Sequence, residues 1–217
     1  MRKIIFVLAC LTVTPAIAED YWCEDYESCT LAEANMRHDN YVGIRLHKNE
    51  SIMYAYDIHG RGGDRIRKDN LGFGAIIGNR LTDRVKIEFE TMYTGAKQTK
   101  HDTKYDFDVW ANMVNIYAFK EYQNAIAPYA GLGIGLSGIW TDINSKSSVS
   151  LTDSVLELSF SAMVGINLAL NSRIDLNLGF KYQYYGEVEH MLENREFAVT
   201  DVDATEFYIG AVYKFGI

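Results

Sequence analysis

Long apolar runs are missing from this 217-residue sequence, although 48% of its residues are hydrophobic. No stretch stays apolar for the ~18 residues that a membrane-spanning helix needs, so the chain does not look like a helical membrane protein. Proline is also scarce, with two residues against 17 glycines, and this balance suits a sheet protein with close strand packing. Basic residues are outnumbered by acidic ones, 21 to 29. The net charge of −8 argues against nucleic acid as a partner, because phosphate binding needs a basic surface.

The first 18 residues have the pattern of a signal peptide. Arg2 and Lys3 make a short basic region, residues 4–13 are apolar, and the last three residues up to Ala18 have the small-x-small form of a cleavage site. We predict cleavage after Ala18, which removes two cations and no acid and so changes the net charge from −8 to −10. The alternative is a lipoprotein lipidated at Cys10, although the apolar run before Cys10 is short.

Two cysteines, Cys23 and Cys29, remain after this cleavage. An exported protein meets an oxidising compartment, so we predict a disulfide between them, with two free thiols as the alternative. Both lie in the acidic, polar segment 19–39, which has no sustained period and is expected to be a periplasmic lead-in. No metal site is predicted, because two cysteines and the lone His38 cannot fill a zinc shell.

From residue 40 to residue 217 the sequence alternates with a period of two. Segments 85–93 and 174–184 place apolar residues on one face and polar residues on the other. Strict alternation over 9–11 residues is a strand pattern and not a helix pattern. The apolar residues of segment 105–119 change phase near Trp110, which predicts a bulge. Eight strands are expected in all, at 42–56, 71–78, 85–93, 105–119, 128–137, 156–167, 174–184 and 206–215.

The seven connections between these strands alternate in length. Bacterial outer-membrane barrels have tight periplasmic turns and longer outer loops. The alternation therefore predicts both chain ends and three tight turns in the periplasm, with four long extracellular loops. The expected long connections are 57–69, 95–104, 142–153 and 186–203, and the short ones are 79–84, 120–125 and 169–173.

The two faces of these strands favour a barrel in a membrane. A tilted strand needs about 9–11 residues to cross the hydrocarbon, whereas soluble strands usually run ~5–6. Tyr and Trp recur near the strand ends, and both favour the lipid–water interface. These aromatic residues are Tyr54, Tyr56, Tyr93, Tyr105, Tyr117, Trp140, Tyr182, Tyr184 and Tyr213. The polar face mixes small residues with charges of both signs, which suits the narrow, filled lumen of an eight-stranded barrel. A soluble barrel such as a lipocalin, with this face in water, is the alternative. The predicted lumen charge network is Arg45, Lys86, Glu88, Glu90, Glu157, Asp175, Lys181, Glu206 and Lys214.

Three segments resemble a known family. Residues 127–137 read Ala-Pro-Tyr-Ala-Gly-Leu-Gly-Ile-Gly-Leu-Ser, which is similar to the Pro-Tyr-x-Gly-x-Gly-x-Gly strand of the outer-membrane protein A and opacity-protein β-barrel family. Segments 114–119 and 207–215 are similar to strands of the same family, and the resemblance covers about residues 40–217. It implies an eight-stranded outer-membrane barrel and is nearly silent on activity. It also implies an assembly signal in the last strand, at Tyr213, Phe215 and Ile217.

The sequence predicts no catalytic residue and no cofactor. The five histidines form no His-x-x-x-His or His-Glu-x-x-His spacing, and no Gly-x-Ser-x-Gly elbow occurs. A lipid A deacylase-like barrel needs a His close to a Ser, yet Ser159 and Ser161 have no His in local sequence. An omptin-like protease needs acids and a His above the rim. The loop residues that would have to meet there are His59, His101, Asp102, Glu187, Glu189 and His190.

The leading hypothesis is a non-enzymatic bacterial outer-membrane barrel with a structural or surface-interaction role. Expected partners are outer-membrane lipid and lipopolysaccharide, the barrel assembly machinery, and a host or envelope protein met through the outer loops. Segment 186–203 is the longest connection and the best candidate for that last contact. The alternatives are a narrow, low-conductance pore and an outer-membrane lipid-modifying enzyme or protease.

Overall fold

The computed structural model describes residues 40–57, 64–100, 103–120, 125–145, 150–192 and 195–216. In these residues no helix is long and apolar enough to cross a membrane. They form eight strands, as the alternation predicts. The strands are β1 (Asn40–Asp57), β2 (Asp64–Arg80), β3 (Val85–Lys100), β4 (Thr103–Phe119), β5 (Ile126–Ser145), β6 (Ser150–Ala169), β7 (Ile174–Leu192) and β8 (Arg195–Phe215).

The eight strands form one closed barrel. Each strand pairs antiparallel with its neighbours in the sequence, and β1 pairs with β8 to close the sheet. The closing ladder runs from Asn40↔Phe215 to Asp57↔Ala198. β1 passes through this ladder without a break, although its alternation is irregular near 48–51. The predicted all-β, eight-stranded antiparallel up-and-down barrel is confirmed.

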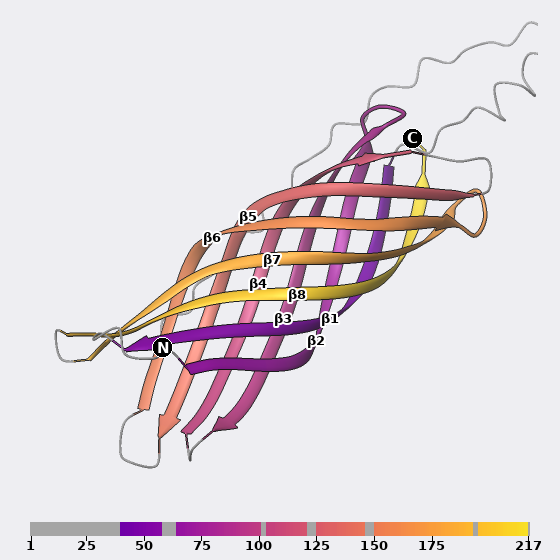
Figure 1. Ribbon diagram of the computed structural model, residues 1–217. Coiled ribbons are helices and arrows are strands. Elements are labelled where there is room, and N and C mark those ends of the chain that lie inside the picture. Colours follow the sequence, from indigo (N-terminus) through magenta and orange to yellow (C-terminus); the bar gives the residue numbers. More distant parts are fainter. Residues whose placement is uncertain are drawn as a thin grey trace, which may run out of the picture.

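The barrel has two ends that differ in construction. The near end holds the start of β1, the end of β8 and the connections β2–β3, β4–β5 and β6–β7 (Figure 1). Two of these turns are closed by side-chain oxygens, because Thr82 accepts hydrogen bonds from the backbone N–H groups of Arg84 and Val85. Asn171 does the same in the β6–β7 turn. The far end is the opposite one, where β1–β2, β3–β4, β5–β6 and β7–β8 are joined.

Alternation along each strand explains why these residues close a barrel with a filled interior. Large apolar side chains such as Ile44, Leu132 and Phe180 point outward and are more than half exposed. Glycines and polar side chains point inward along most of the lumen, together with the buried aromatic and apolar clusters described below. At Gly135 a Cβ atom would overlap the carbonyl oxygen of Asn112 on β4, so this inward position on β5 requires glycine.

The strands are longer than the sequence predicts. They run for 16 to 21 residues, whereas alternation on the outer face marks only about 9–11. The segments expected to be four long loops are therefore mostly strand at the far end. For example, β3 continues to Lys100 and β4 starts at Thr103, inside the expected loop 95–104. That expectation is wrong because polar residues on both faces also suit a strand that stands clear of the hydrocarbon.

The bulge expected in β4 near Trp110 is absent from the described residues. β4 pairs in continuous register with both β3 and β5. The change of phase arises because Phe107, Val109 and Ala111 point inward and are buried in an apolar layer of the lumen. Register shifts occur instead between β7 and β8, at Tyr184/Gly186 and His190/Met191.

The bulge at Tyr184/Gly186 re-aims the far part of β7. Gly186 has φ +124°, a conformation that side chains with a Cβ rarely adopt. Tyr185 continues the inward alternation of Lys181 and Gln183 and is fully buried, and the extra residue at the bulge changes the phase after it, so that Glu187 points outward. Beyond the bulge Val188 is again inward and buried. β-bulges commonly re-aim a side chain or end a pairing in this way.

The barrel wall divides into two four-stranded sheets at the far end. The β6–β7 ladder stops at Phe160↔Tyr184, and the β2–β3 ladder stops at Gly72↔Thr94. Beyond these points β3, β4, β5 and β6 form one sheet, and β7, β8, β1 and β2 form the other. Figure 1 shows the two sets of strands diverging from each other.

An apolar core fills the space between these two sheets. Ile139 from β5 belongs to one sheet, and Val188 and Val202 from β7 and β8 belong to the other, all with no exposed surface. We call this cluster the apolar plug. Removing apolar side chains from water is the main stabilising contribution to a protein core. The apolar plug is Met92, Phe107, Val109, Ala111, Met113, Ile139, Tyr185, Val188, Val202 and Ala204.

Candidate functional site

Arg45 on β1 is the centre of a buried ion network in the lumen. Its Nη1 donates to Glu88 Oε1 at 2.7 Å, and its Nη2 donates to Glu88 Oε2 at 3.0 Å. This is the bidentate arrangement that the planar guanidinium favours with a carboxylate. Nη1 also donates to Glu90 Oε1 at 3.2 Å, and Nε donates to Asn177 Oδ1 at 3.0 Å. The side chains of Arg45, Glu88 and Glu90 are at most 1% exposed.

Lys181 on β7 extends this network across the lumen. Its Nζ lies 3.2 Å from Glu206 Oε2 and 3.4 Å from Glu90 Oε2. Tyr185 Oη donates to the other oxygen of Glu206 at 2.6 Å. Each carboxylate oxygen pair in the network therefore has cations or hydroxyl groups around it, as buried charges require.

His47 lies between two of these carboxylates. Its Nδ1 is 3.0 Å from Glu206 Oε2, within hydrogen-bond distance. Its Nε2 is 3.4 Å from Glu90 Oε1, which is ion-pair distance without hydrogen-bond geometry. The imidazole is fully buried, and its ring packs against the ring of Tyr208 with a centroid distance of 5.6 Å.

Aromatic side chains occupy the lumen between the ion network and the near end. Lys86 Nζ lies 4.7 Å from the ring centroid of Tyr117 and 5.0 Å from that of Tyr129, which is cation–π distance. The hydroxyl groups of Tyr129 and Tyr208 are 2.6 Å apart. Tyr117 Oη donates to Glu88 Oε1 at 2.8 Å and so joins the aromatic layer to the ion network.

The lumen therefore contains three tiers of side chains, and its buried Lys, Arg and Glu residues balance in charge once Lys86 of the aromatic layer is counted with the ion network. From the near end outward they are the aromatic layer, the ion network and the apolar plug. Among the buried residues described here, the cations Arg45, Lys86 and Lys181 face three carboxylates. Those carboxylates are Glu88, Glu90 and Glu206. A neutral set of buried charges is the arrangement that the low dielectric inside a barrel favours.

The structure brings together most, but not all, of the residues predicted for the lumen network. Asp175 and Lys214 form a separate ion pair of 2.8 Å toward the near end, and both are partly exposed. Glu157 lies apart, against Gly186 at the far end. It is separated because the β6–β7 ladder stops at Phe160, below this residue.

Several participants were missed in the sequence. His47 follows Arg45 by two positions and so shares its inward face, which alternation alone indicates. Tyr185 has the same signal, since it follows the inward residues Lys181 and Gln183 by four and two positions, but it lies one residue beyond the strand expected at 174–184. Tyr117 was assigned to the lipid–water interface as an aromatic near a strand end, yet it points into the lumen and is 1% exposed.

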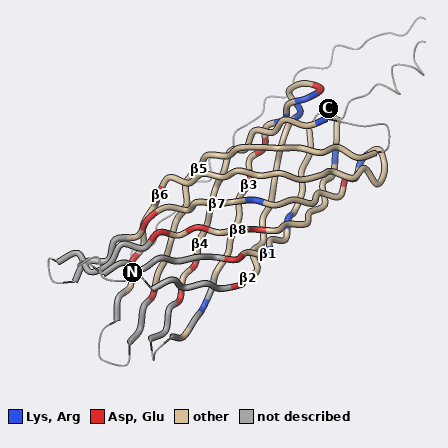
Figure 2. The backbone as a smooth tube through the Cα atoms, viewed as in Figure 1, with Lys and Arg blue, Asp and Glu red and all other residues tan. Residues whose placement is uncertain are grey.

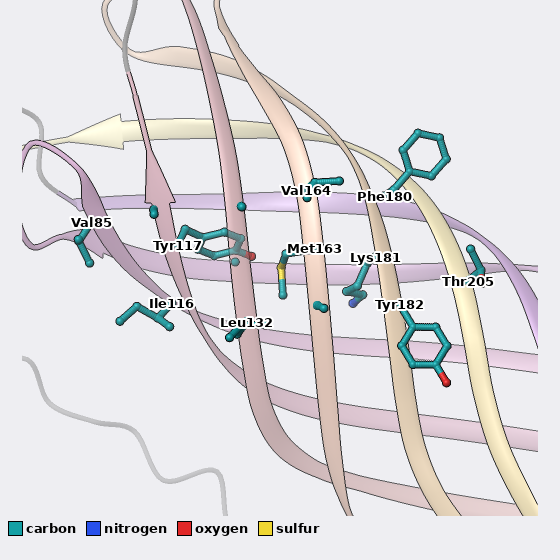
Figure 3. Close-up of a pocket in the computed structure, with 14 residues that line it drawn as sticks. Val85, Ile116, Tyr117, Leu132, Met163, Val164, Phe180, Lys181, Tyr182 and Thr205 are labelled. Carbon is teal, nitrogen blue, oxygen red and sulfur yellow. The ribbon is translucent and has the colours of Figure 1, made fainter.

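A groove of about 730 Å³ lies on the outer face of the barrel (Figure 3). It forms where the outward residues Ala118, Ala130 and Ala162 are small, between the larger side chains of Ile116 and Phe180. Its lining is almost wholly apolar, and it lies on the same outer face as the exposed apolar side chains such as Leu132 and Phe180. Such walls suit contact with hydrocarbon chains.

The sequence assigns the chain to a known family. It matches the outer membrane protein β-barrel domain family over residues 7–215. The chain is a member of this family. No curated protein sequence matches it.

Solved structures of other barrels share its fold. Neisserial surface protein A is 16% identical with a TM-score of 0.57, over 81% of this chain and 97% of that chain. OprG from Pseudomonas aeruginosa is 15% identical with a TM-score of 0.53, over 83% of this chain and 98% of that chain. AlkL is 16% identical with a TM-score of 0.51, over 92% and 97%. At these identities the likeness shows the fold alone.

This barrel lies in the bacterial outer membrane. The connections span two to six residues at the far end and four to six at the near end, so their lengths do not orient it. Among the described residues, only at the far end do the strands continue well past the outward apolar residues, and the placement of that end outside stays a prediction. Figure 2 shows cations gathered at the near end, where Arg84, Lys120 and Arg173 are exposed. The outward acids lie nearer the far end than the exposed apolar residues do. In β8, for example, Phe207, Ile209 and Tyr213 are exposed apolar residues, and Asp203 and Asp201 lie beyond them toward the far end.

Some predicted sites lie outside the described residues. They are the signal peptide with its cut at Ala18, the lead-in 19–39 with Cys23 and Cys29, and the last residue of the assembly signal, Ile217. Of that signal, Tyr213 and Phe215 stack with ring centroids 6.5 Å apart at the end of β8. In the part of the chain that the structure describes, no group of three or more His, Cys, Asp or Glu side chains is placed to hold a metal ion.

Proposed function

We propose that this outer-membrane barrel is a non-conducting, non-enzymatic protein that serves envelope integrity or surface contact. The observation that supports this most is the filled lumen. The ion network and the apolar plug are stacked in it, one above the other. An eight-stranded barrel has an interior only wide enough for side chains to fill, and here the side chains fill it.

Ion conduction is disfavoured at both layers. Arg45, Lys181 and Glu206 have at most 2% of their surface exposed, so a hydrated ion would have to break buried ion pairs to pass. Breaking such a pair leaves an uncompensated buried charge, which costs several kcal/mol, about 3–5. The apolar plug adds a second barrier, because the side chains of Val109, Ile139 and Val188 have no polar atom that could replace an ion's hydration shell.

The described lumen also does not present a reactive group to a substrate. His47, Glu90 and Glu206 have the residue types of an acid–base site, yet all three are fully buried. A general base must lie within hydrogen-bond reach of the proton it takes from a substrate. The hydrogen bond between His47 and Glu206 and the 3.4 Å ion-pair contact between His47 and Glu90 instead link β1 to β8 and β3 across the lumen.

The far end is the part of the molecule left for surface contact. Its strands continue past the apolar belt with charged outward residues such as Asp106, Asp108 and Asp201. We expect lipopolysaccharide around these strand ends and a host or envelope protein above them, with the barrel assembly machinery acting earlier on β8. These partners follow from the membrane position and from exposure of the far end.

Conductance and complementation together test this function. Purified protein inserted into planar bilayers should give no stable current, while a porin inserted under the same conditions does. Steady current steps from the wild-type barrel would contradict the proposal.

In cells, a deletion strain should become sensitive to detergents or lose a surface contact, and wild-type protein should restore the phenotype. A variant with Asp106→Asn, Asp108→Asn, Asp201→Asn and Asp203→Asn separates the two roles. It should restore detergent resistance but not surface contact. Turnover of labelled lipid A or of peptides by the purified barrel would overturn the non-enzymatic assignment.

A further inference from the structure

Two open seams run down the wall of the barrel at its far end. The first seam lies between β6 and β7, beyond Phe160↔Tyr184. The strands still touch where Gly186 lies against Glu157, but they form no ladder there. The second seam lies between β2 and β3, beyond Gly72↔Thr94.

Each seam exposes two strand edges that form no backbone ladder with each other. A side chain bridges the start of each seam, because Ser159 Oγ donates to the carbonyl oxygen of Tyr185 and Asn70 Nδ2 donates to that of Gly95. In the first seam these edges are residues 150–159 of β6 and 185–192 of β7. In the second they are residues 64–71 of β2 and 95–100 of β3. All four segments are paired on their other side, so they are formed strands that lack one neighbour. An unpaired strand edge is a template for another strand.

The first seam is acidic. Its β6 edge contains Asp153 and Glu157, its β7 edge contains Glu187 and Glu189, and neither edge contains Lys or Arg. Between the two edges is a hollow of about 440 Å³, and Asp153, Glu157 and Glu187 are in its wall. We call this the acidic seam.

The second seam is basic. Its β3 edge contains Lys97 and Lys100 and no acid, and Lys97 Nζ also lies 2.8 Å from Asp106 Oδ2 on β4. Its β2 edge contains three cations against two acids. The cations are Arg65, Arg67 and Lys68, and the acids are Asp64 and Asp69. We call this the basic seam. Its charge is opposite to that of the acidic seam, and attraction between opposite surfaces guides association and fixes register.

The two seams lie on opposite sides of the barrel, because four strands separate them in either direction. Both are at the far end, so two barrels inserted upright in one membrane have them at the same side of the bilayer. If a second copy is placed beside the first by translation alone, its basic seam meets the acidic seam of the first.

The strand directions also match in that arrangement. β1 runs from the near end to the far end, and the strands alternate in direction from there. β6 of one copy and β3 of the next are therefore antiparallel, and so are β7 of one copy and β2 of the next. Each junction would extend an existing four-stranded sheet by another four strands.

We propose that the acidic seam of one copy binds the basic seam of a second copy by antiparallel pairing of their strand edges. Main-chain hydrogen bonds supply the attraction in this kind of strand addition, and the charges select the partner edge. Because the contact joins different surfaces of the two copies and involves no rotation, it repeats without closing. The protein would then form rows in the outer membrane. This inference is independent of the proposed function.

Cross-linking in vesicles tests the contact. The background carries Cys23→Ser and Cys29→Ser. One protein carries Ser154→Cys on β6, and the other carries Thr99→Cys on β3; both positions are exposed. A short bis-maleimide should link the mixed proteins about tenfold more than a control mixture of Lys48→Cys and Thr99→Cys, since a contact worth about 1.4 kcal/mol gives that ratio. Lys48 is exposed on the closed β1 wall.

Charge reversal then tests the pairing itself. Adding Asp153→Lys to the Ser154→Cys protein should lower its cross-linking to the Thr99→Cys protein, because cations then face each other. Adding Lys100→Glu to the Thr99→Cys protein should restore it. The heat-dependent shift of each variant on gels shows that its barrel has folded.

Three results would overturn the proposal. They are mixed cross-linking no higher than the control, equal linking of Ser154→Cys protein to itself, and linking that ignores both charge reversals. Capture of an unrelated extended peptide in the acidic seam, with no linking between copies, would also overturn it and would assign the seam to another partner.

Discussion

At the scale of single residues, the lumen depends on a few buried charges with several partners each. Arg45 contacts Glu88 with both nitrogens of its fork and also reaches Glu90. Lys in its place would offer only a point charge and would not match the Glu88 carboxylate. Such a buried set adds little net stability compared with apolar packing, but losing one member is costly.

Replacing Arg45 should therefore destabilise the barrel strongly. Arg45→Met leaves Glu88 and Glu90 buried without their main cation, and we expect the free energy of unfolding to fall by about 3–5 kcal/mol. The measurement is urea unfolding in lipid vesicles.

Two further variants serve as a rescue and as a control for that measurement. Arg45→Met with Glu88→Gln should recover part of the loss, because one unpaired charge is removed. Lys48→Met, at an exposed position on the same strand, should change the free energy of unfolding by no more than about 0.5 kcal/mol. Equal losses from Arg45→Met and Lys48→Met would show that the network is not required.

A second residue-scale effect lies outside the membrane, at the far end. Asp201 on β8 pairs across the ladder with Glu187 on β7. Partial burial, together with the neighbouring Glu187 carboxylate, raises the pKa of Asp201 above its usual value of 3.8. The folded protein therefore holds this proton more tightly than the unfolded chain does. The resulting stabilisation is complete below pH 3.8 and is lost as the pH rises through the raised pKa.

Asp201→Asn should accordingly raise the unfolding temperature at pH 7 and have little effect near pH 3.5. The amide removes the repulsion from Glu187 at neutral pH, while at acidic pH the Asp201 carboxyl group is itself protonated and carries no charge to remove. Thermal unfolding followed by circular dichroism at the two pH values measures this. Asp69→Asn at an exposed position controls for the change in net charge. A stabilisation that is the same at both pH values would contradict the pair.

At the scale of strands, the far end behaves as two sheets and not as a barrel wall. β4 has a paired neighbour on both sides along its whole length. β6 has two neighbours only from Phe160 to Ala169, and from Ser150 to Ser159 it is paired with β5 alone. Alternate backbone N–H groups of that outer part therefore lack a ladder partner.

Hydrogen exchange should reveal this division within a single strand. The segment 150–159 should exchange about half of its amides quickly, whereas 160–169 should be protected throughout. Mass spectrometry of the barrel in lipid gives both rates, with the described part of β4 as the fully protected reference. Uniform protection along β6 in a preparation of single barrels would show that the seam is closed.

At the scale of the whole molecule, alternation was enough to predict the strand number, the closure and the membrane. It also placed Arg45, Glu88, Glu90, Lys181 and Glu206 on the inner face, where the structure has them in contact. The reason is that a period of two is set by backbone geometry and needs no knowledge of the partner strands.

The rest could not be predicted because it depends on pairing between strands. Phe107 and Val109 resemble a phase error in the sequence, and only the facing sheet shows that they belong to an apolar plug. Glu157 has the right alternation for the lumen network but lies where β6 has left β7. The sequence predicts loops at the far end because residues that are polar on both faces occur both in loops and in strands that stand in water.

The most direct test of the filled lumen is the reactivity of a cysteine placed inside it. Ser137 on β5 is fully buried and accepts a hydrogen bond from Ser159 at 2.6 Å. With Cys23→Ser and Cys29→Ser in the background, Ser137→Cys should not react with a hydrophilic maleimide in the folded barrel. It should react fully after unfolding, while Thr152→Cys, exposed on β6, reacts at once. Labelling of Ser137→Cys in the folded barrel at the rate of Thr152→Cys would contradict a sealed lumen.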